Sequence, residues 1–307
     1  MDYDAIVVGG SFAGLSAAMQ LGRARRRVLV IDAGEPRNRF AEASHGFLGH
    51  DGRPPRDLLR DAAAEVAAYP GVRLVAGTAV AARAAGAGFA VALADGSEHR
   101  GAKLLLAVGV SDTLPDVPGL AERWGRTVLH CPYCHGYEVA GRPLGVLANS
   151  PHSAHQAVMI PDWGPTTYFT QGAFEPDADQ AAQLAARGVT VERVPIADLL
   201  GAAPALEAVR LADGRIVPVA ALFTAPRTRP AGPLAEQLGC AFEDGMTGPQ
   251  IKVDAMKETS VPGVFAAGDA AHGIHNATLA SAAGVLAGVA AHRALIMDDV
   301  ARRSRAA

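Results

Sequence analysis

The sequence predicts an α/β protein of two three-layer domains, in which the second domain is inserted into the first. Short β-branched runs alternate with Ala-rich helical stretches over the first third of the 307 residues, and a second strand–helix–strand series begins at residue 144. Stretches rich in proline at 115–119 and 225–230 separate the two series. At roughly 150 residues per domain, the length suits two domains.

The first domain opens with a strand at residues 5–8, a helix at 14–22 and a strand at 28–31. This order implies a parallel sheet with helices on its faces. The further expected elements are a helix at 58–68, strands at 72–80, 90–94, 104–108 and 263–267, and an Ala-rich helix at 276–296. We assign residues 1–115 and 226–307 to this discontinuous domain.

The inserted domain, residues 116–225, repeats the alternation. Its expected elements are a strand at 144–148, a helix at 153–163, a strand at 166–170, a helix at 179–187 and a strand at 189–194. Both domains are therefore expected to be Rossmann-like.

Composition excludes several classes of function. The net charge of −3 gives no reason to expect a nucleic-acid partner or an anionic membrane. Three cysteines are too few for a disulfide scaffold and fit a reducing cytoplasm. Asp2 and Asp4 lie where a signal peptide would be basic, and no apolar run reaches about 18 residues. We expect a cytoplasmic protein without a membrane span.

A turn with glycines lies between the first strand and the first helix. It contains Gly9, Gly10, Ser11, Phe12, Ala13 and Gly14. Gly9 allows the tight turn and Gly14 lets helix and strand pack closely, so the helix N-terminus faces a pyrophosphate. Asp32 ends the next strand, where an acid can hold a ribose hydroxyl. Ser11 replaces a usual glycine but is small. The turn predicts a dinucleotide site, and the alternative is a structural turn of another α/β protein.

A second acidic residue follows an apolar strand near the C-terminus. Asp269 comes after residues 263–267 and Gly268. At the carboxyl end of a strand it is well placed to bind a ligand hydroxyl. By spacing alone, a helix-capping or turn aspartate is equally consistent.

A CxxC pair, Cys131 and Cys134, carries the expected chemistry. Cysteines at this spacing close a small ring, and the motif commonly lowers the pKa of one thiol. His135 follows at once and can move protons near neutral pH. A structural zinc site needs four ligands, and the sequence has no second CxxC or HxxxH. We therefore expect a redox-active pair and no metal.

These motifs resemble low-molecular-weight thioredoxin reductases over nearly the whole chain. The resemblance rests on residues 8–14, on the strand 104–109 that ends at Gly109, on the cysteine pair and on residues 262–269. It implies FAD in a discontinuous domain, a smaller inserted domain with the CxxC, and a homodimer. It also implies that Cys134 faces the flavin and Cys131 exchanges with the substrate. Asp269 would bind the ribityl chain, and Asn276 with Ala277 would open a helix pointing at the flavin's pyrimidine end.

A closer likeness is to dithiol oxidases of the gliotoxin- and holomycin-forming type. Residues 131–138 are similar to theirs, with His135 where reductases carry aspartate. The stretches that contain Arg37 with Asn38, and His45, are similar too. His45 is a candidate for contact with flavin or substrate, and the alternative is a structural histidine. Glu138, one helical turn from His135, is a candidate to orient its imidazole.

The nucleotide site of the inserted domain lacks the usual residues. The turn after strand 144–148 has Asn149, Ser150 and Pro151 where glycines would stand, and Ser150 with Pro151 suits a helix cap and first turn. The next strand ends in Thr170, Gln171 and Gly172, without an acid for a ribose. NADPH is therefore a doubtful reductant.

The sequence thus predicts an FAD-dependent enzyme that oxidises a dithiol through Cys131 and Cys134 and passes electrons to dioxygen. The substrate class is a small-molecule or peptide dithiol, or a thioredoxin-like protein. The first rival is a disulfide reductase fed by NAD(P)H or another donor. The second is a non-catalytic flavin-binding regulator.

Overall fold

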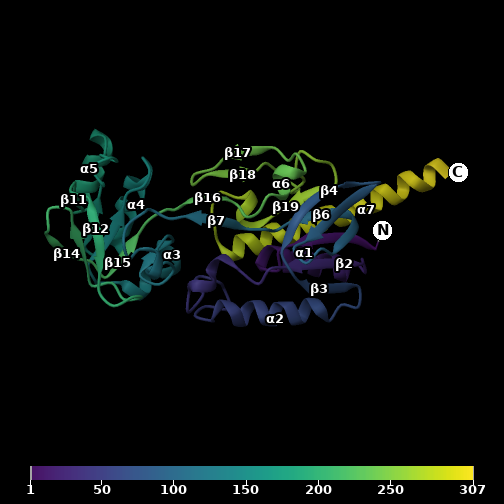
Figure 1. The fold of residues 1–307 in the computed structure, drawn as a ribbon, viewed down its shortest axis with the longest axis horizontal. Helices are drawn as coiled ribbons and strands as arrows, with labels where there is room; N and C mark the ends of the chain where they lie inside the picture. Colours follow the sequence, from purple (N-terminus) through teal and green to yellow (C-terminus); the bar gives the residue numbers. More distant parts are fainter. Residues whose placement is uncertain (1, 307) are drawn as a thin grey trace. The chain divides into compact units, whose positions relative to one another are not determined.

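A computed structural model describes residues 2–306, and the chain divides into two compact units (Figure 1). Unit 1 comprises Met1–Arg39, Arg56–Ser111 and Thr228–Ala307, and unit 2 comprises Phe40–Pro55 and Asp112–Arg227. The sequence places the boundaries at 115/116 and 225/226. In the structure they fall inside two strands that pair with each other, β7 (Val110–Thr113) and β16 (Arg227–Pro230). The excursion Phe40–Pro55 into unit 2 has no counterpart in the sequence-based division.

Unit 1 is built on a mixed sheet with the strand order β3–β2–β1–β6–β5–β4, and β19 also pairs with β6. The strands are β1 (Tyr3–Val8), β2 (Val28–Asp32), β3 (Val72–Ala76), β4 (Ala79–Ala85), β5 (Gly88–Leu93), β6 (Glu98–Leu106) and β19 (Val264–Ala266). β6 is long enough to pair in parallel with β1 on one edge and, on the other, with antiparallel β5 and then parallel β19. The sequence predicts one strand over 72–80, but Gly77 and Thr78 interrupt it, and β4 joins the opposite edge of the sheet.

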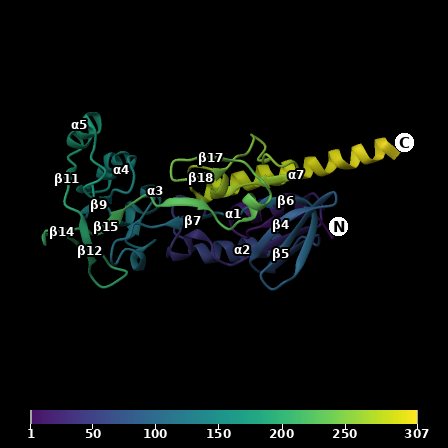
Figure 2. The same cartoon turned by 45° about the horizontal axis from the view of Figure 1, so that its top comes forward.

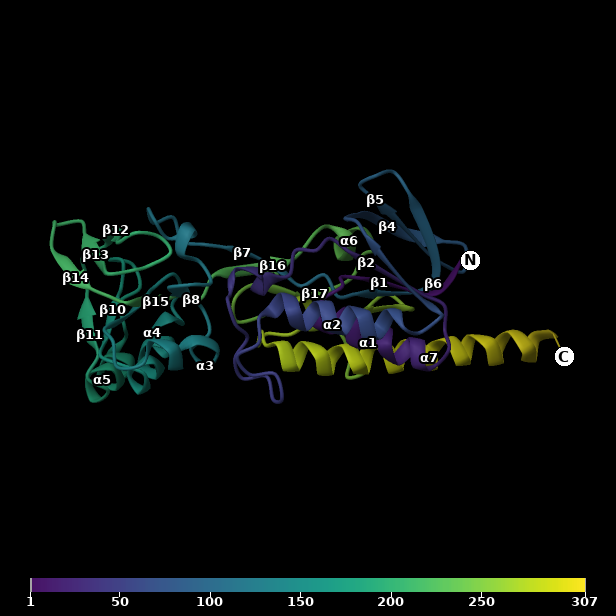
Figure 3. The same ribbon diagram turned by 90° about the horizontal axis from the view of Figure 1, so that it is seen from below.

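Three helices cover one face of this sheet: α1 (Phe12–Arg23), α2 (Pro55–Ala67) and α7 (Ala277–Ala306) (Figure 3). The alternate strand residues point to them, among which Val7, Val30 and Leu105 are buried. The other face is covered by the β4–β5 hairpin, α6 (Leu234–Gln237) and the pair β17 (Phe242–Asp244) and β18 (Pro249–Ile251). The hairpin and α7 lie on opposite sides of the unit (Figure 2). The three long helices thus lie on one face, whereas the other face carries mainly strands and the four-residue helix α6.

The helix α7 runs ten residues beyond the predicted end at 296. Its residues 277–305 are long and apolar enough to cross a membrane, which the sequence analysis does not anticipate, but 39% of its most apolar window is buried in the structure. Gly284 and Gly288 lie directly against the backbone carbonyls of Ala13 and Ala17 on α1. This close packing is that of a core helix, so its composition is weak evidence for a membrane span.

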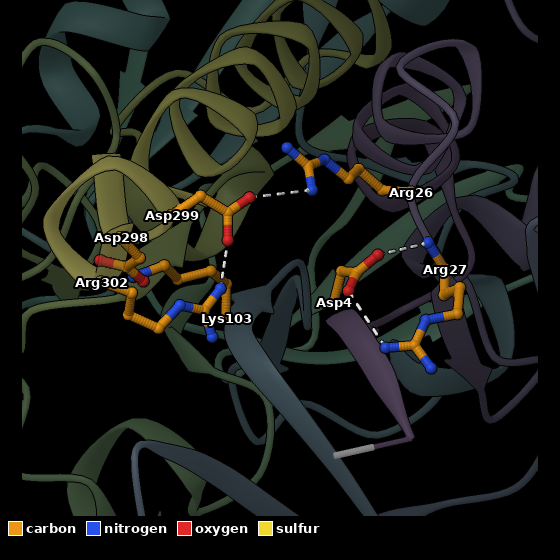
Figure 4. Close-up of polar contacts among 7 residues, drawn as sticks. All are labelled: Asp4, Arg26, Arg27, Lys103, Asp298, Asp299 and Arg302. Carbon is orange, nitrogen blue, oxygen red and sulfur yellow. Dashed lines mark hydrogen bonds and ion pairs between the residues drawn. The ribbon is translucent and has the colours of Figure 1, made fainter. Parts of the chain in front are cut away.

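Polar contacts hold the last turns of α7 to the rest of unit 1 (Figure 4). The Nζ atom of Lys103, a largely buried side chain on β6, lies 2.8 Å from Oδ2 of Asp298. Asp299 pairs with Arg26 and with Arg302 one turn further on. Burial of the Lys103 ammonium is tolerable because a carboxylate accompanies it.

Unit 2 has a parallel sheet with the order β11–β10–β9–β15–β8. The strands are β8 (Val128–Leu129), β9 (Leu144–Leu147), β10 (Thr166–Phe169), β11 (Thr190–Glu192) and β15 (Ala221–Phe223). One face packs on α4 (Ser153–Met159) and α5 (Ala178–Ala186), and the other on an antiparallel sheet of β12 (Ile196–Leu200), β13 (Ala208–Leu211) and β14 (Ile216–Pro218) (Figure 3). The predicted α/β fold class of two Rossmann-like domains with parallel sheets is confirmed.

Candidate active site

The predicted cysteine pair forms a disulfide in unit 2. Cys131 and Cys134 are bonded, with Cα atoms 5.3 Å apart, and both are partly exposed. Cys131 follows β8 and caps the short helix α3 (Pro132–His135), which Pro132 begins. Proline suits this first helical position because its missing N–H has no partner in the helix. A partly exposed disulfide at this position is open to exchange with a thiol.

His135, directly after Cys134, is partly buried. Burial lowers the pKa of His135 below the usual 6.5, the Glu138 carboxylate opposes this change in pKa, and His45 adds to it. Because desolvation disfavours the imidazolium, the ring is a neutral base at pH 7. A neutral imidazole beside a disulfide can accept the proton of an incoming thiol.

Glu138 and His45 lie together. Glu138 belongs to the 3₁₀ turn Tyr137–Val139, which follows α3, and so is not on one continuous helix with His135 as expected. The Oε1 atom of Glu138 is 3.4 Å from Nε2 of His45. The opposite ring nitrogen, Nδ1 of His45, is 3.5 Å from Oδ1 of Asp51. His45 was a candidate for flavin or substrate contact, and its contacts here are with two carboxylates of unit 2.

Apolar side chains are exposed in the same part of unit 2. Tyr133, inside the CxxC, is 74% exposed and Tyr137 is 84% exposed, while Leu48 on the loop after His45 is 96% exposed. The ring of Tyr133 packs edge-on against Trp163. Large apolar side chains are thus exposed on the CxxC segment and on the loop after His45.

The predicted dinucleotide turn of unit 1 leaves no room for a side chain at two of its glycines. Gly9 has φ +108°, and a Cβ there would lie 2.1 Å from the carbonyl oxygen of Ala107. A Cβ on Gly14 would lie 1.7 Å from the carbonyl oxygen of Gly9. Asp32 at the end of β2 accepts the N–H of Gly10 at 3.1 Å, so it braces the turn. Ser11 begins α1 without a side-chain cap. The turn can therefore admit a phosphate at the N-terminus of α1.

The remaining predicted cofactor residues of unit 1 lie on turns and helix starts. Asp269, in the 3₁₀ turn Gly268–Ala271, is 3.5 Å from Nη1 of Arg37. Asn276 caps α7 by accepting the N–H groups of Thr278 and Leu279. Gly109 lies just after β6, Asn38 in the 3₁₀ turn Arg37–Phe40, Ala13 on α1, and Ala277 at the start of α7. Burial, and then the Arg37 and His272 charges, lower the pKa of His275 to about 4.

The turn after β9 in unit 2 is closed by its own side chains. The Ser153 hydroxyl oxygen accepts the backbone N–H of Asn149 at 3.1 Å and that of Ser150 at 3.2 Å. The Asn149 amide donates to the carbonyl of Ala225. The helix α4 starts at Ser153 with His152 at its N-cap position and without a side-chain cap, so the predicted cap by Ser150 is wrong. Two backbone donors that a phosphate would need are thus already used.

Sequence reasoning missed two residues of these sites. Asp51 lies six positions after His45 but was not singled out in the sequence, and only the folding of the loop brings the two together. Ser153 was expected only as a helical residue. Its hydrogen bonds with the preceding backbone N–H groups were not foreseen, because such contacts have no distinct sequence signal. Within residues 2–306, no group of three His, Cys, Asp or Glu side chains forms a candidate metal site.

A parallel α/β fold that carries a redox disulfide next to a histidine, together with a glycine turn, defines a disulfide oxidoreductase. Residues 3–160 and 167–284 match the family described as pyridine nucleotide-disulphide oxidoreductase, and the chain belongs to this family.

Two relatives match this chain over nearly its whole length. The chain is 34% identical to "Thioredoxin reductase sirT" of Leptosphaeria maculans, over 99% of this chain and 97% of the relative. It is 31% identical to "Thioredoxin reductase tcpT" of Claviceps purpurea, over 96% and 95%.

Solved structures agree as well. The crystal structure of an oxidoreductase from Agrobacterium tumefaciens superposes with a TM-score of 0.92 at 49% identity, over 97% of this chain and 99% of that one. The crystal structure of HlmI gives a TM-score of 0.92 at 37% identity, over 99% and 95%. The thioredoxin reductase-like resemblance is confirmed, and the protein is an oxidoreductase enzyme of a flavoprotein family.

Proposed function

We propose that this enzyme is an FAD-dependent dithiol oxidase, which converts a substrate dithiol to a disulfide and reduces dioxygen to hydrogen peroxide. The observation that carries the proposal is the position of His135 directly after Cys134, since burial lowers its pKa and leaves a neutral base beside the disulfide. Removal of a thiol proton is the first requirement of dithiol oxidation.

The proposed exchange involves only side chains of unit 2. His135 accepts the proton of one substrate thiol, and the thiolate attacks Sγ of Cys131. The Cys131–Cys134 bond breaks, and Cys134 leaves with the electron pair as a thiolate. The second substrate thiol attacks the mixed disulfide, which releases the substrate disulfide and a reduced Cys131. One substrate dithiol is oxidised and one enzyme disulfide is reduced.

FAD fits the turn of unit 1. The glycines leave room for a pyrophosphate at the start of α1. Asp32 ends β2 and Asp269 lies in the turn that follows β19, and at both places a hydroxyl can be bound. When bound, FAD would accept two electrons from the cysteine pair and pass them to dioxygen. Two protons accompany the two electrons, so the disulfide re-forms and hydrogen peroxide is the second product.

Several features argue against a pyridine nucleotide in unit 2. Ser153 occupies two backbone donors of the turn after β9. At the end of β10, where a ribose would be anchored, the Thr170 hydroxyl donates to Glu175, and Glu175 in turn pairs with Arg193 at 2.9 Å. An arginine already paired to a carboxylate is poorly suited to a 2′-phosphate.

The exposed apolar residues Leu48, Tyr133 and Tyr137 favour a small-molecule or peptide dithiol as the substrate. A thioredoxin-like protein is the other class of substrate that the disulfide chemistry admits.

We also propose a cytoplasmic homodimer, in which apolar residues exposed on α7, such as Leu286, Val289 and Met297, are covered by the second copy.

The alternative function is a disulfide reductase that runs the same exchange in reverse. The names of the relatives sirT and tcpT favour it, since both are described as thioredoxin reductases. It requires an electron donor able to reach the flavin.

Peroxide formation under turnover tests the proposal. The wild-type protein, given a small dithiol in air, should consume oxygen and release one hydrogen peroxide per disulfide formed. Cys131→Ser and Cys134→Ser should each lose this activity by several orders of magnitude, because a covalent relay has no substitute. Dithiol consumption without peroxide, or full activity in either variant, overturns it.

A further inference from the structure

The loop between Ser44 and Arg53 forms a compact hairpin within unit 2. The N–H of Ser44 donates to the carbonyl of Arg53, and the N–H of Gly52 to that of Ser44, both at 2.8 Å. Inside the loop, Asp51 accepts the N–H of Gly46 at 2.8 Å. A Cβ on Gly46 would lie 4.0 Å from the carbonyl oxygen of Tyr133. The hairpin therefore lies against the CxxC segment, which is far from it in sequence.

His45 lies between two carboxylates, one from its own loop and one from the redox segment. Its Nδ1 atom is 3.5 Å from Asp51 and its Nε2 atom 3.4 Å from Glu138. A neutral imidazole has one N–H and can donate to one of them, whereas the protonated ring donates to both. The His45 side chain is 23% exposed, and that of Asp51 is 71% exposed. The better shielded of the two contacts is the one that His45 makes toward Glu138.

Glu138 has little else to hold it. Its side chain is 40% exposed on a 3₁₀ turn, and an exposed glutamate samples many rotamers. Its negative charge nevertheless acts on His135, because it raises the pKa of that imidazole against the effect of burial. The charged groups that act on His135 are Glu138 and His45, and Asp51 acts on His45. Holding the Glu138 carboxylate in place therefore maintains its contribution to the basicity of His135, which burial otherwise lowers.

We propose that His45 is a positioning residue, anchored by Asp51, which holds the Glu138 carboxylate where it supports proton transfer by His135. The proposal rests on the thiol–disulfide exchange described above and adds a residue to it. In that exchange His135 takes the proton of the substrate thiol, the thiolate bonds to Sγ of Cys131, and Cys134 leaves with the electron pair. His45 touches none of the reacting atoms.

The test follows the reaction only as far as the reduced enzyme, because dioxygen, the final electron acceptor, is left out. Dithiothreitol is mixed with the oxidised protein without oxygen, the reaction is stopped by alkylation, and loss of the Cys131–Cys134 disulfide is followed by mass spectrometry. His45→Ala should slow this rate about 10-fold, less than the 10²–10⁴-fold expected for loss of the base itself. His45→Gln, whose amide still donates to Glu138, should recover most of the rate.

His50 offers a matched control. It is a histidine of the same hairpin, it is exposed, and its ring contacts Phe47 and Arg53 of the hairpin rather than a carboxylate of the redox segment. His50→Ala should therefore exchange at the wild-type rate.

A pH titration separates positioning from a packing role. In the wild-type background, Glu138→Gln should shift the half-maximal pH of the exchange downward, because the Glu138 charge raises the pKa of His135. In the His45→Ala background the same change should give no shift, since Glu138 is no longer held near the ring. An equal shift in both backgrounds, or a wild-type rate in His45→Ala, overturns the proposal. If the wild-type disulfide itself does not react with the dithiol, the proposed function fails instead.

Discussion

The hydroxyl oxygen of Ser153 accepts the backbone N–H of Asn149 at 3.1 Å, in the turn where a nucleotide-binding domain would present that N–H to a phosphate. A second N–H, from Ser150, goes to the same oxygen. We therefore expect the dissociation constants of NADPH and NADH to lie above about 1 mM. Isothermal titration of the purified protein checks this, and a dissociation constant in the micromolar range would contradict it.

The two cysteines should differ in what they trap. With Cys134 replaced by serine, the substrate thiolate bonded to Cys131 cannot be displaced by the second cysteine. By the family resemblance, Cys134→Ser should accumulate a mixed disulfide at Cys131, and Cys131→Ser should accumulate much less. Each variant is incubated with the symmetrical disulfide of a monothiol, and intact-mass measurement then detects the mixed disulfide on the protein. Equal adducts on both variants would show that the assigned roles are wrong.

The cofactor turn should not tolerate a side chain at Gly14. A Cβ there would lie 1.7 Å from the carbonyl oxygen of Gly9, so either the helix or the turn must move. Gly14→Ala should yield colourless or insoluble protein, whereas the wild type should purify yellow with one FAD per chain. Absorbance at 450 nm per mole of protein measures this. Normal flavin content in Gly14→Ala would refute the site.

Stability should depend on pH through His275. Burial first, then Arg37 and His272, lower its pKa to about 4 in the folded protein, against about 6.5 when unfolded. The unfolded chain thus binds the extra proton first, and stability is lost as the pH falls from about 6.5 toward 4. Linkage gives about 2 kcal/mol between pH 7 and pH 5.

His275→Asn should remove this contribution to the loss of stability at acidic pH. Urea unfolding of the protein without added flavin, at pH 7 and at pH 5, compares the two proteins, with His50→Asn as the exposed control. The wild type and His275→Asn losing the same stability on acidification would exclude this assignment.

The stability of unit 2 should depend on Arg123, whose charged side chain is buried. Its guanidinium donates to the carbonyl oxygens of Gly119 at 2.7 Å, Ala205 at 2.9 Å and Gly201. Arg123→Met would leave these acceptors without their donor, at a cost of roughly 3 kcal/mol or more. Thermal unfolding should show a fall of several degrees, and an unchanged midpoint would mean that water replaces the side chain at no cost.

Local patterns were enough to predict the parts of the fold that depend on neighbours in sequence. The turn from Gly9 to Gly14, Asp32 at a strand end and the disulfide partners all follow from short spacings. The sheet β12–β14 and the hydrogen bonds from Asn149 and Ser150 to Ser153 could not be predicted, because pairing between short strands and bonding by a hydroxyl leave little periodic signal. The place of His45 beside Glu138 could not be predicted, since it depends on a loop that folds onto a segment far away in sequence.

The most direct test of the central claim is rapid mixing without oxygen, with flavin absorbance followed over time. The oxidase account predicts that a small dithiol bleaches the flavin quickly, that NADPH and NADH at micromolar concentration do so slowly or not at all, and that aeration restores the colour with release of hydrogen peroxide. Rapid bleaching by NADPH or NADH, with little by any dithiol, would contradict it and favour the reductase.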